Sequence, residues 1–199
     1  MPEKIAVLMD GGFVKKKLSQ QHNRFPTIQD ITGLYQTILI SISQPSLGPG
    51  YFECIFMMHP LTKEQVSINF SATPQAVQNQ NLLRSLELQP NFAVRRGSLV
   101  LSGWKLGSAA LKALLAVQRP LNANDLVPDL KQKGVDMRIG LDIAWLSLKK
   151  IVAGMVLVTS DSDFIPAMKF ARKEGIQVFL ETLGHPVFRE LKVHSDIVL

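Results

Sequence analysis

Four short apolar runs, each closed by a polar or turn-forming residue, restrict the fold of this chain more than any other feature. Each run has the length of a buried β-strand, and none alternates apolar with polar residues. Such strands are typical of a parallel sheet that is covered by helices on both faces. The predicted strands are residues 4–9, 51–58, 155–159 and 176–180, with a fifth at 197–199.

Helical patterns lie between these strands. The last of them carries Pro166 in its first turn and Gly175 just beyond its end, as many helices do. Alternating strands and helices imply right-handed crossovers. The sequence therefore predicts an α/β fold, a three-layer α/β/α sandwich with a mostly parallel central sheet. The predicted helices are residues 28–43, 75–87, 140–152 and 164–174.

The middle of the chain fits this pattern less well. A length of 199 residues suits one compact domain, so we expect residues 1–199 to form a single domain. Residues 61–107 are predicted to hold a less typical insertion or arm, in which residues 92–106 have the character of a β-hairpin or extended arm. Residues 118–134 contain two prolines and two asparagines and are predicted to be loop.

Composition narrows the classes of function. Lys and Arg outnumber Asp and Glu by 22 to 16, and an excess of positive charge favours a polyanionic partner. No apolar run is long enough for a transmembrane helix, and the first apolar stretch is too short for a signal peptide. The single cysteine, Cys54, excludes an internal disulfide and a cysteine-rich zinc site. These features predict a cytoplasmic protein without a membrane segment.

Three aspartates follow two of the predicted strands. Asp10 ends the first strand and precedes Gly11 and Gly12, which let the backbone turn tightly and approach a ligand. Asp161 and Asp163 follow the strand at 155–159. Ligands of parallel α/β sheets collect at the carboxyl ends of the strands. The three carboxylates are therefore expected at one edge of the sheet.

Two further acids, Asp136 and Asp142, lie near the start of the helix that leads into the second of these strands. Six residues of α-helix rotate by about 240°, so these two side chains cannot share one face. Five carboxylates near one point repel each other unless a cation neutralises them or some are protonated. Oxygen ligands in this number suit Mg²⁺ or Mn²⁺, which can activate water for attack on a phosphodiester.

Each acid also has an ordinary structural interpretation. Asp136, Asp161 and Asp163 fit helix caps, Asp10 fits a turn, and Asp142 fits an ion pair with Arg138 or Lys149 on the same helix. The convergence of separate segments on one sheet edge favours the metal site over these alternatives.

Three segments together resemble the NYN domain, a branch of the PIN-like nuclease superfamily, and within it the LabA-like (DUF88) subgroup. They are IAVLMDGGF, KGVDMRIGLDIA and VLVTSDSDFIPAMKFARKEG. The resemblance covers about residues 4–18 and 128–199. It implies a three-layer α/β/α fold, a carboxylate site for Mg²⁺ or Mn²⁺, and endonuclease activity on RNA.

The resemblance assigns individual residues. Asp10 takes the place of the family's first-strand aspartate, and Asp136 that of the acid in its K-G-V-D motif. Asp161 and Asp163 match the pair in the S-G-D-S-D-F motif, and Asp142 has a spacing to Asp161 like that of a helix-borne acid in PIN domains. The chain departs from the family's pattern at Phe13, where many NYN domains have Asn, so it lacks a polar group that could orient water or phosphate.

The resulting hypothesis is metal-assisted hydrolysis of RNA. Asp10 and Asp161 would bind the metal directly, Asp142 and Asp163 would complete its shell or act through water, and Asp136 would hold a second metal or position water. Ser160 would donate a hydrogen bond to a carboxylate or phosphate. The remaining candidates for substrate binding are Gly11, Gly12, Lys15, Lys16, Arg138 and Lys133.

Two other functions remain open from the sequence. One is an RNA-binding or regulatory module with a weak or silent metal site, which Phe13 favours. The other is a phosphatase with Asp10 as nucleophile. Such enzymes have a second aspartate two residues later, and the presence of Gly12 at that position argues against this function. A homodimer is a further expectation, because the apolar middle segment needs cover. The scattered histidines His22, His59, His185 and His194 are predicted to be structural or exposed.

Overall fold

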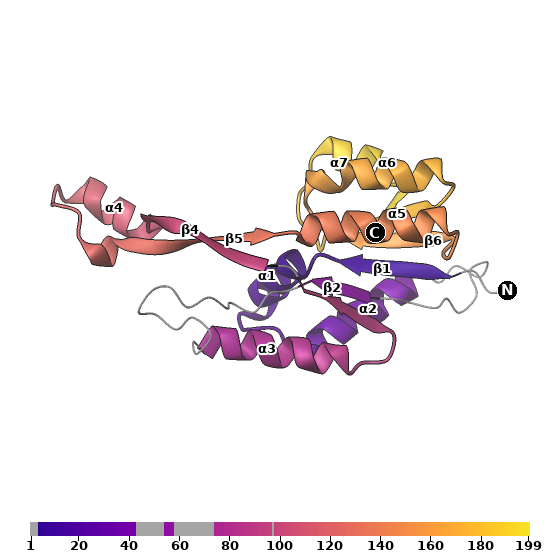
Figure 1. Ribbon diagram of the computed structural model, residues 1–199, viewed down its shortest axis with the longest axis horizontal. Helices are drawn as coiled ribbons and strands as arrows, with labels where there is room; N and C mark the ends of the chain where they lie inside the picture. The colour runs from indigo at the N-terminus through magenta and orange to yellow at the C-terminus, as the bar shows by residue number, and fades with distance from the viewer. Residues whose placement is uncertain (1–3, 43–53, 58–73, 97) are drawn as a thin grey trace.

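The computed structural model describes residues 4–42, 54–57, 74–96 and 98–199. Its body is a six-stranded sheet between two layers of helices, and a two-stranded arm projects from the body (Figure 1). The sheet has the order β3-β2-β1-β6-β7-β8, and all neighbouring strands are parallel. The predicted three-layer α/β/α sandwich with a mostly parallel sheet is confirmed.

Five of the strands of this sheet lie close to where the apolar runs predict them, whereas the strand at residues 92–95 falls in a segment predicted as a hairpin or extended arm. They are β1 (Ile5–Met9), β2 (Cys54–Met57), β3 (Phe92–Arg95), β6 (Gly154–Val158), β7 (Gln177–Glu181) and β8 (Ile197–Val198). Every residue of β1 and β6 is buried, because both strands are covered by helices on both faces. Of the predicted strand at 51–58, residues 51–53 and 58 lie outside the described residues.

Helices cover the two faces of the sheet. One layer holds α1 (Gly11–His22), α2 (Ile28–Ile42) and α3 (Pro74–Glu87), and the other holds α5 (Val135–Leu148), α6 (Ile165–Lys173) and α7 (Arg189–Val193) (Figure 1). Alternate residues of β1 join the two cores: Val7 packs with the first layer and Leu8 with the second. None of the helices in the described part of the chain combines the length and apolar character that a membrane span needs.

Helix α5 begins five residues earlier than predicted. Its N-cap is Gly134, which adopts a left-handed backbone conformation with φ 81°. This conformation favours glycine and turns the chain from strand into helix without a loop. Asp136 is consequently the second residue of the helix rather than its cap, so the capping interpretation of Asp136 is wrong.

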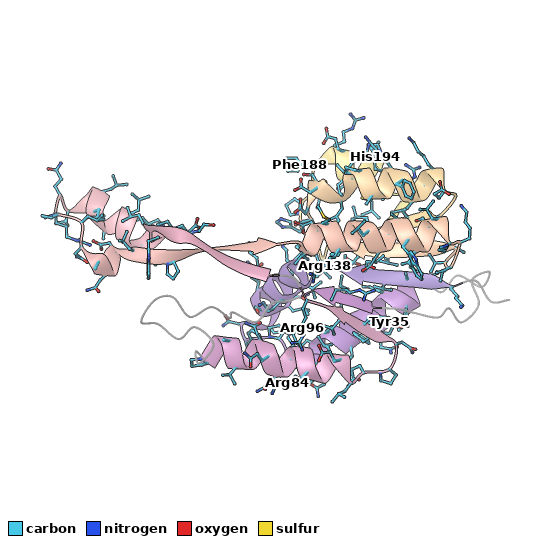
Figure 2. The ribbon with its side chains drawn as sticks, viewed as in Figure 1. Tyr35, Arg84, Arg96, Arg138, Phe188 and His194 are labelled. Carbon is cyan, nitrogen blue, oxygen red and sulfur yellow. The ribbon has the colours of Figure 1, made fainter. Side chains whose placement is uncertain are left out.

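Residues 92–106, predicted as a β-hairpin or extended arm, do not form a hairpin, but residues 98–106 do form part of an extended arm. β3 joins the body sheet beside β2, where the ring of Phe92 meets Tyr35 of α2 edge-on at 5.2 Å (Figure 2). β4 (Ser98–Leu106) instead pairs antiparallel with β5 (Leu126–Lys133), in a segment predicted as loop. Pro128 is tolerated there because a two-stranded ribbon has open edges.

The arm therefore consists of residues 98–133, with α4 (Ser108–Ala116) near its tip. Its strands leave the sheet edge at which β1 and β6 end (Figure 1). Of the residues 61–107 that the sequence marks as less typical, residues 61–73 and 97 lie outside the described residues.

Candidate active site

The central strands β1 and β6 end side by side. Met9 and Val158 are partners in the parallel ladder, and the backbone N–H of Asp10 donates to the carbonyl oxygen of Val158 at 3.1 Å. Thr159 leaves the sheet beside Asp10, and Asp161 follows two residues later. The structure thus brings Asp10 and Asp161 to the same carboxyl edge.

Asp10 is half-buried and caps α1. Its Oδ1 atom accepts hydrogen bonds from the backbone N–H groups of Gly12 at 2.9 Å and Phe13 at 3.1 Å, whereas Oδ2 takes no part in these bonds. Burial raises the pKa of the Asp10 carboxyl, the two hydrogen bonds oppose this change, and repulsion from Asp136 and Asp161 adds to it. Asp10 is therefore both a structural cap and one member of a group of mutually repelling acids.

The loop after β6 is ordered by hydrogen bonds to its own side chains. Oγ1 of the buried Thr159 accepts the N–H of Asp161 at 3.1 Å, and Oδ1 of Asp161 accepts the N–H of Asp163 at 2.9 Å. Asp161 thus caps a 3₁₀ turn at Ser162–Phe164, as the capping interpretation predicts. Phe164 is buried beneath this turn and anchors the loop to the core, while Asp163 is exposed.

Asp136 joins this group from the first turn of α5. Partial burial and repulsion from Asp161 and Asp163 raise the pKa of the Asp136 carboxyl. Because Asp136 also repels Asp10, four acids from three segments interact electrostatically at one edge of the sheet. Among the described side chains, no Lys, Arg or His forms an ion pair with any of these four.

Within the described residues, Asp142 has a basic partner, unlike the four acids of this group. It is six residues beyond Asp136, about 9 Å along the helix, and it forms an ion pair with Arg95 at 3.2 Å from Nε to Oδ2. The sequence left open an ion pair with Arg138 or Lys149 as the alternative to a metal role, and the partner found is instead Arg95. The pair ties α5 to the end of β3, a contact between residues 47 positions apart.

The four acids fit a hard divalent cation by their chemistry. They offer oxygen ligands, and their mutual repulsion would be relieved by positive charge. As they stand, no three Asp, Glu, His or Cys side chains within the described part of the chain are placed to hold one ion. Asp136 and Asp163 are exposed, and exposed side chains change rotamer rapidly.

The predicted basic residues differ in their surroundings. Lys15 is partly buried and donates from Nζ to Oδ1 of Asn79 at 2.8 Å. Lys16 and Arg138 are exposed, and Figure 2 shows Arg138 at the start of α5. The side chain of Lys133 lies outside what the structure describes.

Two residues near this edge were not predicted as part of the site. Nδ1 of His185 lies 2.9 Å from Nζ of Lys17, so this nitrogen accepts from the lysine. Glu181 ends β7 in register with Val158, and its Oε1 accepts the N–H of Leu183 at 2.6 Å. The sequence signal that could have identified both residues is their position just after the predicted strand 176–180. Phe13 packs against the core, with its ring centroid 6.1 Å from that of His185.

The buried lysine makes stability depend on pH. Burial lowers the pKa of Lys15 to about 8, from 10.5. The charged form is therefore disfavoured in the folded state and lowers the unfolding free energy at low pH. This penalty disappears as the pH rises from the folded pKa to the unfolded pKa. Relative to Lys15→Met, the wild type is expected to gain about 2 kcal/mol of unfolding free energy between pH 8 and pH 10.5, measured by urea denaturation.

The exposed neighbour supplies the control. Lys16→Met removes the same charge from an exposed position on the same helix. Equal pH dependence of the two differences would show that Lys15 is not the titrating group.

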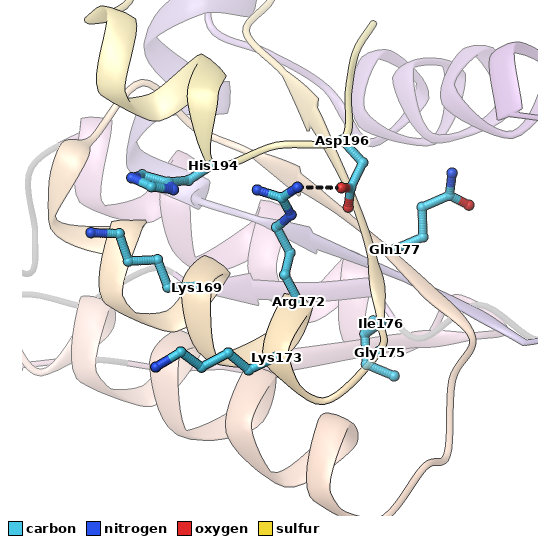
Figure 3. Close-up of a pocket in the computed structure, with 8 residues that line it drawn as sticks. All are labelled: Lys169, Arg172, Lys173, Gly175, Ile176, Gln177, His194 and Asp196. Carbon is cyan, nitrogen blue, oxygen red and sulfur yellow. Dashed lines mark ion pairs between the residues drawn. The ribbon is translucent and has the colours of Figure 1, made fainter.

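A separate hollow of about 710 Å³ lies between α6 and the segment after α7. Figure 3 shows Lys169, Lys173 and His194 around it, with Arg172 paired to Asp196 at 2.9 Å. Its wall includes Gln177, the first residue of β7, so the hollow opens at the sheet edge opposite the acids. It is not part of the candidate active site.

Comparison with known proteins adds one match. The profile of the NYN domain matches residues 73–192, which is more than half of the chain. The matched range includes Asp136, Asp142, Asp161 and Asp163 and excludes β1 with Asp10. No curated protein matches the chain.

Proposed function

The chain belongs to the NYN domain family of PIN-like nucleases, and from this premise we propose that it is a metal-dependent endoribonuclease of the LabA-like subgroup. The observation that carries the proposal is the mutual repulsion of Asp10, Asp136 and Asp161, which three separate segments bring to one sheet edge. Such an arrangement costs stability in the absence of a cation. The body and the arm are proposed to act as one domain, in the cytoplasm.

The acids would have different roles, set by their positions. Asp10 and Asp161 would hold Mg²⁺ or Mn²⁺, because their backbone hydrogen bonds fix both side chains. Asp136 and Asp163 would complete the set, and Asp142 would position α5 through Arg95. The bound ion would supply Lewis-acid charge and a water of lowered pKa.

The remaining residues would bind and orient the RNA. The exposed side chains of Lys16 on α1 and Arg138 on α5 would contact phosphates, and Lys15 and Lys133 would add positive charge. Gly11 and Gly12 would let the backbone of α1 approach the substrate, since neither has a Cβ atom. The Ser160 hydroxyl would donate to a phosphate oxygen.

A second candidate function is RNA binding without cleavage. Phe13 favours it, because an apolar side chain packed against the core occupies the position at which many NYN domains offer an amide. Binding without hydrolysis under every metal condition would support this alternative.

A cleavage assay decides between the two functions. The purified protein is incubated with end-labelled single-stranded and hairpin RNA, and with DNA of the same sequence, in Mn²⁺, Mg²⁺ or EDTA. Internal cuts in RNA that require the metal are expected. Cuts that persist in EDTA, or in the double variant Asp10→Asn with Asp161→Asn, would show that hydrolysis does not depend on this site.

Asp136 and Asp142 are expected to differ in the same assay. Asp136→Asn should lower the cleavage rate by about a hundredfold or more, because a carboxylate beside the ion is lost. Asp142→Asn should lower it by less than about tenfold, because only a partly exposed ion pair with Arg95 is removed. The reverse order of effects would mean that Asp142 leaves Arg95 to join the site.

A further inference from the structure

Helix α5 carries an apolar stripe on its outer face. Met137, Leu141, Trp145 and Leu148 are 73%, 62%, 54% and 59% exposed. Their spacing of four, four and three residues places them within about 80° of arc on the helix. The opposite face is apolar as well, with Ile139, Ile143 and Leu146 buried in the body. A helix that is apolar on both faces is typical of one that is covered on both sides.

A second apolar surface lies at the end of the arm. Helix α4 has no buried residue, and Leu111 and Leu115 lie one turn apart with exposed fractions of 46% and 77%. Val117 and Leu121, which follow α4, are 65% and 57% exposed. We call these four residues the tip surface and the four residues of α5 the α5 stripe.

The tip is an ordered structure. Arg119 donates from both terminal nitrogens to the buried Asp125, which also accepts the backbone N–H of Asn122 at 2.9 Å. The side chain of Asn122 in turn caps the short 3₁₀ turn at Ala123–Asp125. A surface held in this way loses little conformational entropy when it binds.

The two apolar surfaces of one chain face different regions of space. β5 ends at Lys133 and α5 begins at Val135, so the arm and the helix are joined by Gly134 alone. The arm points away from α5 along the long axis of the molecule (Figure 1). The tip surface therefore cannot fold back onto the α5 stripe of its own chain.

The lengths of arm and helix correspond. The eight residues of β5 span about 26 Å at the rise of a β-strand. The fourteen residues of α5 span about 21 Å at the rise of an α-helix. In two copies placed antiparallel, the arm of each would run along the α5 of the other.

The exposed apolar area is sufficient for a stable dimer. Trp104 and Val127 on the arm are also exposed, at 43% and 39%. With the tip surface and the α5 stripe they present on the order of 500 Å² of apolar side chain per copy. A standard interface buries about 800 Å² per partner, of which about 65% is apolar in homodimers. A second copy of this chain therefore supplies a matching area, and the reciprocal contact closes as a two-fold dimer.

We propose that the chain forms a two-fold dimer in which the tip surface of each copy covers the α5 stripe of the other. Both surfaces lie on exposed side chains outside the acid group, so the dimer does not depend on catalysis. A wild type that stays monomeric would overturn the dimer and leave a different protein as the occupant of these surfaces.

Sedimentation equilibrium over a range of concentrations tests the dimer. It is run in about 0.5 M salt, which weakens any bridging of basic chains by RNA. The wild type is expected to be dimeric, and Leu115→Glu and Leu141→Lys should each raise the dimer dissociation constant by about tenfold or more. Ile40→Glu, at a 75% exposed position on α2, is the control and should leave the dissociation constant unchanged.

Mixing the two variants tests the exchange of arms. In a heterodimer of Leu115→Glu with Leu141→Lys, one contact keeps the wild-type tip surface and stripe, while the other opposes Glu to Lys. The mixture should therefore dimerise more tightly than either variant alone. A monomeric wild type, a dimer unaffected by Leu115→Glu, or a mixture no tighter than its components would each overturn the proposal. Circular dichroism of each variant at low concentration confirms that the monomer is folded.

Discussion

Asp10→Asn is expected to lower the rate of metal-dependent RNA cleavage by about a thousandfold or more while the chain remains folded. The amide loses the charge that would hold the cation. Its oxygen can still accept the N–H groups of Gly12 and Phe13, so the cap of α1 is kept. Single-turnover cleavage of end-labelled RNA in Mn²⁺ measures the loss.

The same variant is also expected to change the thermal stability of the chain. Because burial raises the pKa of Asp10, the protonated carboxyl is favoured in the folded state. Its contribution to the unfolding free energy is present below the unfolded pKa and is lost as pH rises through the folded pKa. At pH 7 in EDTA, Asp10→Asn should therefore have a higher melting temperature than the wild type. Glu174→Gln removes one carboxylate at the far end of α6 and should change neither cleavage nor this pH dependence. A wild-type cleavage rate in Asp10→Asn would exclude Asp10 from the metal site.

Phe164→Ala is expected to have the largest effect on stability. Phe164 is 1% exposed and packs among the side chains of α5, α6 and the sheet. Truncation of a buried Phe costs about 3–5 kcal/mol, which is a large part of the stability of an ordinary domain. Because Phe164 also ends the turn that carries Asp161 and Asp163, cleavage should fall as well. Guanidinium denaturation measures the change in unfolding free energy.

A phenylalanine at the surface provides the matched control. Phe188 is 72% exposed at the N-cap of α7 (Figure 2), and Phe188→Ala should change the unfolding free energy by no more than about 0.5 kcal/mol. If the two substitutions cost the same, the core beneath the acid loop is not packed as the structure describes.

The body of the fold follows from local patterns. β1 and β6 are buried on both faces, and a strand in that position must be apolar at every residue, which makes it visible in the sequence. The stripe of α2 is equally visible, because Ile31, Tyr35 and Ile38 recur at helical spacing and are all buried. These elements need no knowledge of distant residues.

The arm did not follow from local patterns. β4 and β5 pair across an interval that holds a helix and a 3₁₀ turn, so neither strand has its partner nearby in the chain. The prolines of 118–134 favour a loop locally, yet Pro128 lies within β5. Polar residues also interrupt both strands, so neither shows the uninterrupted apolar run of β1 and β6.

The sequence by itself determined that acids would gather where the central strands end, because parallel strands place their carboxyl ends at one edge and Asp10 and Asp161 directly follow two of them. The tertiary structure alone decided how the two helical acids differ. Asp136 and Asp142 share one helix and the same side-chain chemistry, but repulsion from the strand-end acids raises the pKa of Asp136, whereas Arg95, 47 residues away in the chain, pairs with Asp142 at the end of β3. Long-range contacts set that choice, and no local pattern encodes them.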